Sequence, residues 1–188
     1  FLERQTATFD PATLPERIPD TYDSAAEYHV YLEWVVTRIW CAFGISWHVL
    51  EPFLGILLGL CAACAYGIFR LGMNRTLSAA GTALFVTSPA VLDQVSNMRD
   101  FSKAPFLLAG IYFIGWLVTR RGRASWIHAR AAAMGVIAGL GMGFRQDALI
   151  LVPASLAAIL LGAPGAVFGT APRRLTAAAV YFAAFLAA

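Results

Sequence analysis

Charged side chains are scarce in this sequence, and lysine occurs once, at Lys103. Charged residues make up 13% of the chain, against roughly 25% in a typical soluble domain. No basic run with interleaved aromatic residues is present, so a nucleic-acid partner is not expected. Hydrophobic residues account for 59% of the 188 positions. This balance excludes an ordinary soluble domain and predicts a polytopic membrane protein whose first partner is the lipid bilayer.

Cysteine is also rare, and none of the three cysteines has the surroundings of a redox or metal site. Cys61 and Cys64 form a C-x-x-C pattern, but inside the apolar run LLGLCAACAYGIF. Redox and zinc sites need polar access and further ligands. We interpret the pair as small buried residues of a helix. The sequence also lacks the G-x-S-x-G, H-E-x-x-H and Ser-His-Asp arrangements of hydrolases and proteases.

The first 50 residues differ in composition from the remainder of the chain. Residues 1–27 are polar and contain three prolines, which is typical of a loop. Between residues 24 and 47 apolar side chains recur at helical spacing, and tryptophan and tyrosine are frequent, as they are at membrane interfaces. The members of this stripe are Tyr28, Tyr31, Trp34, Val35, Ile39 and Ala42. We predict an extracytoplasmic region, 1–50, with an amphipathic interfacial helix.

Six apolar segments follow, and they predict an all-α transmembrane helix bundle over residues 51–188 with about six spans. The segments are 52–69, 76–92, 104–118, 131–144, 148–162 and 175–188. Pro153 predicts a kink in the fifth segment. Gly135, Gly139 and Gly143 recur every four residues and predict a face for close helix packing. The chain begins without methionine and ends inside an apolar run, so we interpret it as a fragment truncated at both ends.

The distribution of positive charge predicts the orientation of these spans. If the segments alternate in direction, loops 70–75, 119–130 and 163–174 share one side and contain eight arginines and no acid. The opposite loops, 93–103 and 145–147, contain three basic residues. The positive-inside rule therefore places the first set in the cytoplasm. All eleven acidic residues then fall on the extracytoplasmic side.

The three basic residues on the outer side are Arg99, Lys103 and Arg145. Two of them lie in a polar island, Val91–Pro105, between two apolar segments. Arginine binds phosphate bidentately and lysine binds it as a point charge, so a lipid-linked anion is a candidate ligand. The predicted substrate-binding set is Arg99, Lys103, Arg145, Asp100, Asp147 and His29. The alternative is that Arg99 pairs with Asp100 or Asp93, and Arg145 with Asp147, to tie the loops together.

The loop before the surface helix supplies candidate catalytic acids. Asp23 and Glu27 are four residues apart and would share one face of a helix. One carboxylate could act as a general base, and the two together could hold a divalent cation. His29 is a further candidate base. Alternatively, Asp23 or Ser24 caps the helix and Glu27 complements its dipole.

Four stretches between about residues 20 and 162 resemble the GT-C superfamily of membrane glycosyltransferases, in particular bacterial relatives of protein O-mannosyltransferases and aminoarabinose transferases. The stretches are TYDSAAEYHVYLEW, AYGIFRLGMNRTLSAAGTALFVTSPAVLD, MRDFSKAPFLLAGIYFIGWLV and AGLGMGFRQDALILVPASL. The resemblance implies transfer of a sugar from a polyprenyl-phosphate donor to an extracytoplasmic glycan, lipid or protein. It also implies an essential acid in the first outer loop and a site facing the periplasm or exterior of a bacterial inner membrane.

A transporter or flippase for a lipid-linked or anionic solute is the alternative function. Transporters also contain buried charges and broken helices, but they place polar residues near the middle of the membrane. Here the charged residues gather at one face of the predicted bundle. This asymmetry favours chemistry at the membrane surface over transport.

Overall fold

The computed structural model describes residues 29–119, 126–162 and 170–188, and all regular structure in these ranges is helical. The predicted all-α class is therefore confirmed for the described part of the chain. The elements are α1 (Val30–Phe43), η4 (His48–Leu50), α2 (Glu51–Phe69), α3 (Arg75–Thr87), α4 (Pro89–Ser96), α5 (Met98–Phe101), α6 (Ala104–Thr119), α7 (Ile127–Phe144), η6 (Gln146–Ile150), α8 (Leu151–Leu161) and α9 (Ala171–Ala187). Residues 1–28, which include the predicted N-terminal loop, lie outside the description.

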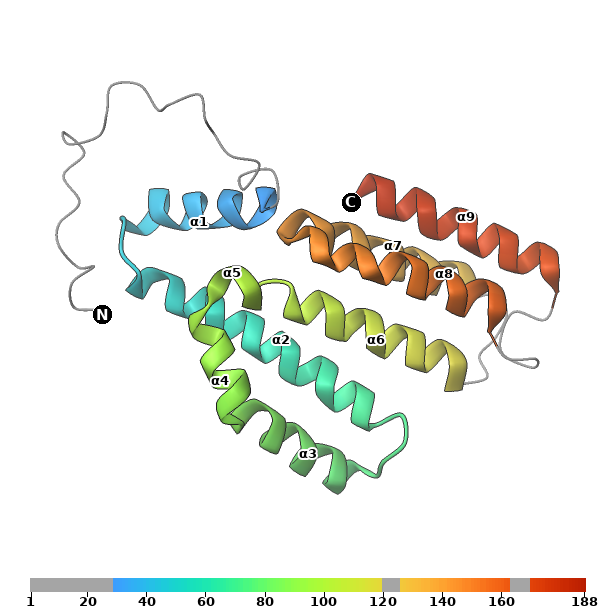
Figure 1. Ribbon diagram of the computed structural model, residues 1–188, viewed down its shortest axis with the longest axis horizontal. Helices are drawn as coiled ribbons and strands as arrows, with labels where there is room; N and C mark the ends of the chain where they lie inside the picture. Colours follow the sequence, from blue (N-terminus) through green and yellow to red (C-terminus); the bar gives the residue numbers. More distant parts are fainter. Residues whose placement is uncertain (1–28, 120–125, 163–169) are drawn as a thin grey trace.

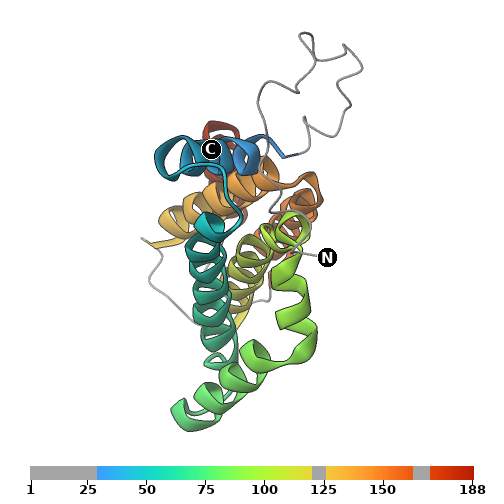
Figure 2. The ribbon, with the colours of Figure 1, turned by 90° about the vertical axis from the view of Figure 1, so that its left-hand side faces the viewer.

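The helices α6 to α9 lie side by side, with α2 next to α6 and α3 at the edge (Figure 1). The largest buried cluster joins α6, α7, α8 and α9 through side chains such as Leu117, Met134, Ile159 and Tyr181. Smaller clusters fix α1 to η4 and α2 to α5. Figure 2 shows α1 at the end of the bundle, next to the start of α2.

Within the described ranges, three helices are long and apolar enough to cross a membrane: His48–Phe69, Met98–Thr119 and Ile127–Phe144. On two of them, large apolar side chains such as Ile56 and Ile111 are more than half exposed, as expected for lipid-facing positions. The chain thus has the features of a membrane protein, and six spans stay a prediction. The helix α3, for example, has 13 residues and extends roughly 20 Å, less than the roughly 30 Å hydrocarbon core.

The apolar segment 76–92 is not one continuous helix, because the chain breaks at Ser88–Pro89. Ser88 has an extended backbone, and Pro89 begins a new helix, α4. Proline has no N–H to continue the helical ladder and is well suited to the first turn. The Ser88 hydroxyl accepts a hydrogen bond from the Val91 N–H at 3.4 Å. The two helices diverge at this point (Figure 1).

Pro153 lies near the start of its helix and not in the middle of a long span. The chain leaves α7 through η6, and α8 begins at Leu151, so that Pro153 lies in its first turn. An N–H in the first turn has no intrahelical partner. Proline therefore costs little there, and the predicted kink stays a prediction.

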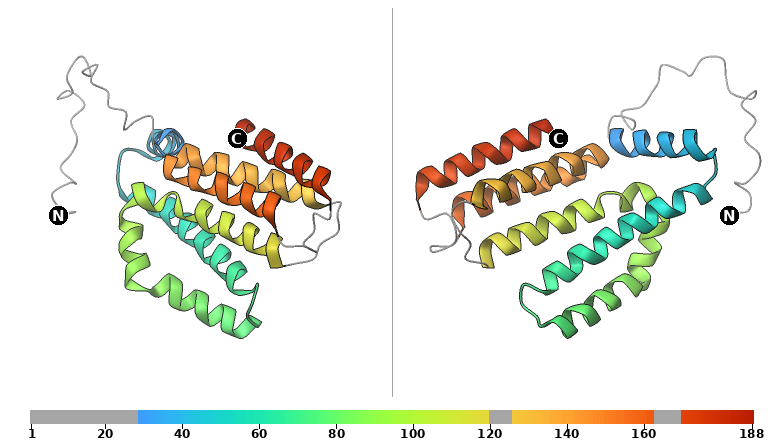
Figure 3. Two further views of the ribbon diagram at one scale, coloured as in Figure 1. Left: turned by 45° about the vertical axis from the view of Figure 1, so that its right-hand side comes forward. Right: turned by 180° about the vertical axis from the view of Figure 1, so that it is seen from behind.

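The predicted packing face of α7 is confirmed. A Cβ added at Gly139 would lie 2.7 Å from the Phe185 carbonyl oxygen, and one added at Gly135 would lie 2.9 Å from the Ala184 Cβ. Both contacts are with α9, which runs alongside α7 (Figure 3). Gly143, the third member, instead faces the ring of Tyr31 on α1. The ridge therefore serves two neighbours.

The helix α1 ends at Phe43, before the end of the predicted range 24–47, and its buried face is turned relative to the predicted stripe. Its buried side chains are Leu32 and Val36, which pack with Leu50. Trp34, placed on the apolar stripe, is 60% exposed. The helix ends at Gly44, whose φ of 91° is a conformation that glycine adopts without strain.

Candidate functional site

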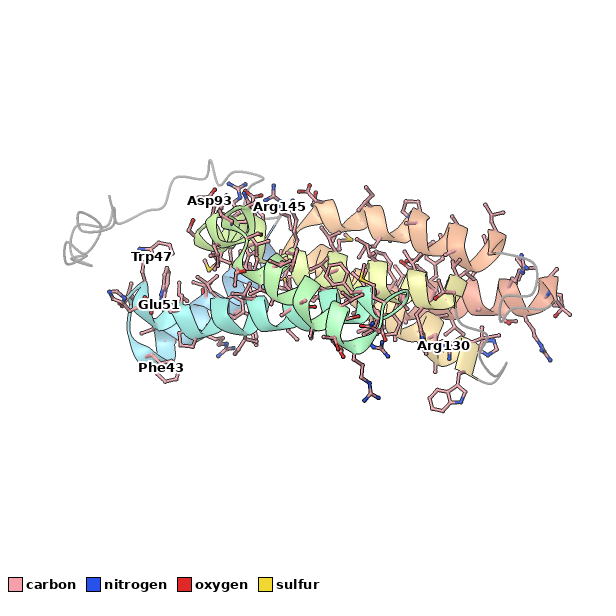
Figure 4. The ribbon with its side chains drawn as sticks, turned by 90° about the horizontal axis from the view of Figure 1, so that it is seen from below. Phe43, Trp47, Glu51, Asp93, Arg130 and Arg145 are labelled. Atoms are coloured by element: carbon pink, nitrogen blue, oxygen red, sulfur yellow. The ribbon has the colours of Figure 1, made fainter. Side chains whose placement is uncertain are left out.

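Charged side chains from two separate segments meet at one end of the bundle. Asp100 and Lys103 lie where α5 passes into α6, and Arg145 and Asp147 lie where α7 passes into η6. Figure 4 shows Arg145 at this end of the molecule and Arg130 at the other. The predicted grouping of these four residues is therefore present, and we call them the outer charge cluster.

The contacts of the outer charge cluster form a closed network. Lys103 Nζ lies 2.6 Å from Asp147 Oδ2, and Arg145 Nε lies 2.8 Å from the same oxygen. Arg145 also pairs with Asp100 through Nη1. The Asn97 side-chain amide donates to Asp100 Oδ2 at 2.7 Å. The alternative that Arg145 pairs with Asp147 is thus confirmed, although Asp147 also binds Lys103.

Two positive and two negative charges cancel within the cluster. The Lys103 and Arg145 side chains are each 23% exposed, whereas Asp147 is 55% exposed. A half-exposed ion pair is weak because water screens it. The carboxylate of Asp147 is therefore the member that an incoming anion could displace most easily. Such an anion would then occupy the place of the Asp147 carboxylate, within hydrogen-bond distance of both Lys103 and Arg145.

Arg99 is directed away from this cluster, and its predicted pairing with Asp100 or Asp93 is wrong. Its Nε donates to His29 Nε2 at 2.8 Å. His29 is buried, and its Nδ1 lies 3.1 Å from the Phe144 carbonyl oxygen. Since a carbonyl only accepts, Nδ1 carries the proton and Nε2 accepts from Arg99. Both ring nitrogens of His29 are engaged, so its role here is to hold Arg99 beside the end of α7.

A groove with apolar walls opens beside the outer charge cluster. Its volume is about 300 Å³, and Asp100, Lys103 and Gln94 lie among its lining residues. Its walls come from α2, α3, α4, α5 and α6, with Cys61, Phe85, Val91, Leu107 and Leu108 among them. The groove thus combines an apolar interior with a charged margin. No sequence pattern predicted it, because its residues come from five helices.

A second groove, of about 440 Å³, is lined by Val30, Tyr31, Trp34, Val35, Leu140 and Phe144. It lies between α1 and α7, and its lining contains no charged side chain. It therefore lacks the combination of apolar and ionic groups that distinguishes the first groove.

Neither predicted acid can be placed in the site, because Asp23 and Glu27 lie outside the described residues. The proposed roles of these two residues, as base or as ligands of a divalent cation, stay predictions. Within the described ranges, no three histidine, cysteine, aspartate or glutamate side chains lie close enough to hold a metal ion.

Acid should weaken the outer charge cluster. The hydrogen bond from Lys103 is the main cause that lowers the pKa of Asp147 below its ordinary 3.8. Because the pKa of Asp147 is lowered in the folded state, its ion pairs stabilise the fold fully at a pH above the ordinary pKa. This stabilisation is lost as the pH falls toward the folded-state pKa. We expect Asp147→Asn to reduce the loss of thermal stability below about pH 4, measured by unfolding in detergent. Glu33→Gln, on the exposed side of α1, should leave the profile unchanged. An unchanged profile in Asp147→Asn would contradict the assignment.

No family model, curated protein or solved structure shows significant similarity to this chain. Inferences about its activity therefore depend on the geometry described above and on the sequence resemblance.

Proposed function

We propose that this protein is an integral-membrane glycosyltransferase that moves a sugar from a polyprenyl-phosphate donor to an extracytoplasmic acceptor. The observation that supports this proposal is the groove of about 300 Å³ with Lys103 and Asp100 at its margin. A polyprenyl phosphate matches this groove, because it has a long apolar chain for the apolar walls and one anionic group for the charged margin. The groove is at the lower end of ligand-pocket volumes, so it would hold only the part of the chain nearest the phosphate.

The apolar walls would bind the prenyl chain by excluding water. Each buried CH₂ contributes about 0.8 kcal/mol relative to water, although a chain leaving the bilayer gains less. The walls therefore serve mainly to orient the chain, so that the phosphate reaches the groove margin at Lys103. The remaining chain would extend along the exposed apolar faces of α2 and α6.

The outer charge cluster would stabilise the leaving group. In the proposed reaction, an acceptor hydroxyl attacks the anomeric carbon, the bond from that carbon to the phosphate oxygen breaks, and its electron pair stays on the phosphate. Lys103 and Arg145 would then bind the charge that develops there. The hydroxyl proton would pass to a carboxylate, for which Asp23 remains the candidate and Glu27 the second. By the positive-inside argument, the site would face the periplasm or exterior of a bacterial inner membrane.

A groove-filling substitution tests this proposal. Ala90 lies on α4 and lines the groove, so we expect Ala90→Phe to lower release of polyprenyl phosphate from a polyprenyl-phosphate hexose by about tenfold, since phenylalanine would occupy the volume needed by several chain carbons. The measurement uses the full chain in liposomes at subsaturating donor. Ala83→Phe is the matched control, because Ala83 is exposed on α3 and is not among the lining residues.

The same liposomes separate the proposed function from transport. If polyprenyl phosphate is never released but a labelled lipid-linked sugar crosses the bilayer, the glycosyltransferase proposal is wrong and the transporter alternative is favoured. If Ala90→Phe and Ala83→Phe release product equally, the groove does not bind the donor.

A further inference from the structure

A second cationic centre lies at the opposite end of α7 from the outer charge cluster. Arg130 belongs to the first turns of α7, and Figure 4 shows it far from Arg145. Its guanidinium carbon lies 3.5 Å from the ring centroid of Trp116 on α6. Stacking of this kind holds the planar guanidinium in one orientation. Arg130 is therefore positioned by α6 and α7 together.

Two of the three guanidinium nitrogens of Arg130 lack a hydrogen-bond partner among the described residues. Its Nε and Nη1 are both buried and make no hydrogen bond within this part of the chain. A buried donor without an acceptor is costly, and more so when it is charged. The side chain as a whole is only half-buried, so the stacked guanidinium lies near the edge of the packed helices. The missing acceptor is therefore expected to come from outside the described chain.

The neighbouring groups at this end are basic. The helices α7 and α9 both begin here (Figure 3), and helix N-termini favour anions. His128 Nε2 lies 3.1 Å from the Thr176 hydroxyl, which fixes the first turns of α7 and α9 together. Arg174 donates from Nη1 to the Leu160 carbonyl at 2.8 Å, closing the end of α8. Segments 119–130 and 163–174 contain no acidic residue, so the sequence offers Arg130 no adjacent carboxylate.

The position of Arg130 identifies the chemistry of its partner. Its backbone lies about one turn inside the end of a candidate span, a depth from which a long arginine side chain reaches the phosphate groups of a bilayer. Trp126, 59% exposed on the same side, is the type of residue that marks this level. Planar guanidinium donors match the oxygens of a phosphate. We propose that Arg130, stacked on Trp116, binds the phosphate of an anionic phospholipid at the inner end of α6 and α7, independently of the proposed donor site.

Native mass spectrometry of the full chain in detergent tests this proposal. The protein is titrated with phosphatidylglycerol, with phosphatidylcholine and with glycerol phosphate. We expect one phosphatidylglycerol molecule to bind more tightly than phosphatidylcholine or glycerol phosphate by about tenfold, and Arg130→Gln to remove that preference, because the charge-assisted hydrogen bonds to the phosphate are lost. Arg38→Gln is the matched control, because Arg38 lies over Trp34 at 5.3 Å on the exposed side of α1.

A second variant keeps the outcome clear if Arg130→Gln does not fold. Arg130→Lys retains the charge but loses the planar pair of donors, so it should bind phosphatidylglycerol with an intermediate preference over phosphatidylcholine. Equal retention of phosphatidylglycerol by the wild type, Arg130→Lys and Arg38→Gln would overturn the proposal. Glycerol phosphate that displaces the bound phosphatidylglycerol would show that the site takes a soluble phosphate, which would overturn the lipid assignment.

Discussion

Replacing Gly139 with leucine is expected to separate α7 from α9 and to lower the free energy of unfolding by about 3 kcal/mol, at the upper end of overpacking effects. The first atom of the new side chain, its Cβ, would lie 2.7 Å from the Phe185 carbonyl oxygen and 2.8 Å from the Ala188 Cβ. A backbone carbonyl in a helix cannot move aside as a flexible side chain can. The two helices must therefore move apart, and the buried cluster that they share with α8 opens with them.

The effect is measured by chemical or thermal unfolding of the full chain in detergent, followed by circular dichroism. Gly59→Leu is the matched control, because a Cβ at Gly59 on α2 would meet no atom within 4 Å. Leucine favours a helix over glycine by nearly 1 kcal/mol, so the control should leave the protein equally stable or more stable. Equal destabilisation by both substitutions would show that close packing at Gly139 contributes nothing specific.

The glycine ridge shows why much of the helical fold could be predicted from sequence. Small residues at a spacing of four must lie on one face of a helix, and the apolar segments fixed approximately where helices occur. The positions of helix breaks were harder to predict from the sequence. In the structure, Pro89 begins α4 and Pro153 lies in the first turn of α8. In the sequence, an apolar run continues through both positions. A proline inside such a run can begin a helix or bend one, and the local sequence alone did not distinguish these outcomes.

The candidate site was predictable in its location but not in its contacts. Counting the charges of alternating loops brought Arg99, Lys103 and Arg145 to one end, and the structure places all three there. The bond between Arg99 and His29, 70 residues apart, depends on how α1 lies across the end of α7. The predicted stripe of α1 only partly matches its buried face, and spacing along the chain does not show that His29 would meet Arg99. Lys103 and Asp147, 44 residues apart, are likewise joined only by tertiary packing.

Substitutions in the outer charge cluster should have the largest effects on the proposed transfer reaction. Removing one preorganised donor to a developing anion typically lowers kcat by about 10²–10³-fold, and we expect this loss for Lys103→Ala and Arg145→Ala. Arg99→Ala should have a smaller effect, because its Nε is committed to His29. The measurement is release of polyprenyl phosphate by the full chain in liposomes. Arg75→Ala is the control, since Arg75 is exposed at the start of α3.

Asp147→Asn separates a phosphate site from a simple tie between loops, because the two roles predict different effects on ligand binding. In a phosphate site, Asp147 competes with the ligand for Lys103 and Arg145, so its neutralisation should tighten binding of farnesyl phosphate by about tenfold, a change of 1.4 kcal/mol, and leave farnesol binding unchanged. In a tie, the same substitution should lower stability as much as Lys103→Ala and leave farnesyl phosphate binding unaffected. Unchanged release of polyprenyl phosphate in Arg99→Ala, Lys103→Ala and Arg145→Ala would eliminate the phosphate site. A tighter complex in Asp147→Asn, together with loss of release in Lys103→Ala, would require that the cations act on the ligand, because a structural tie cannot improve when one of its partners is removed.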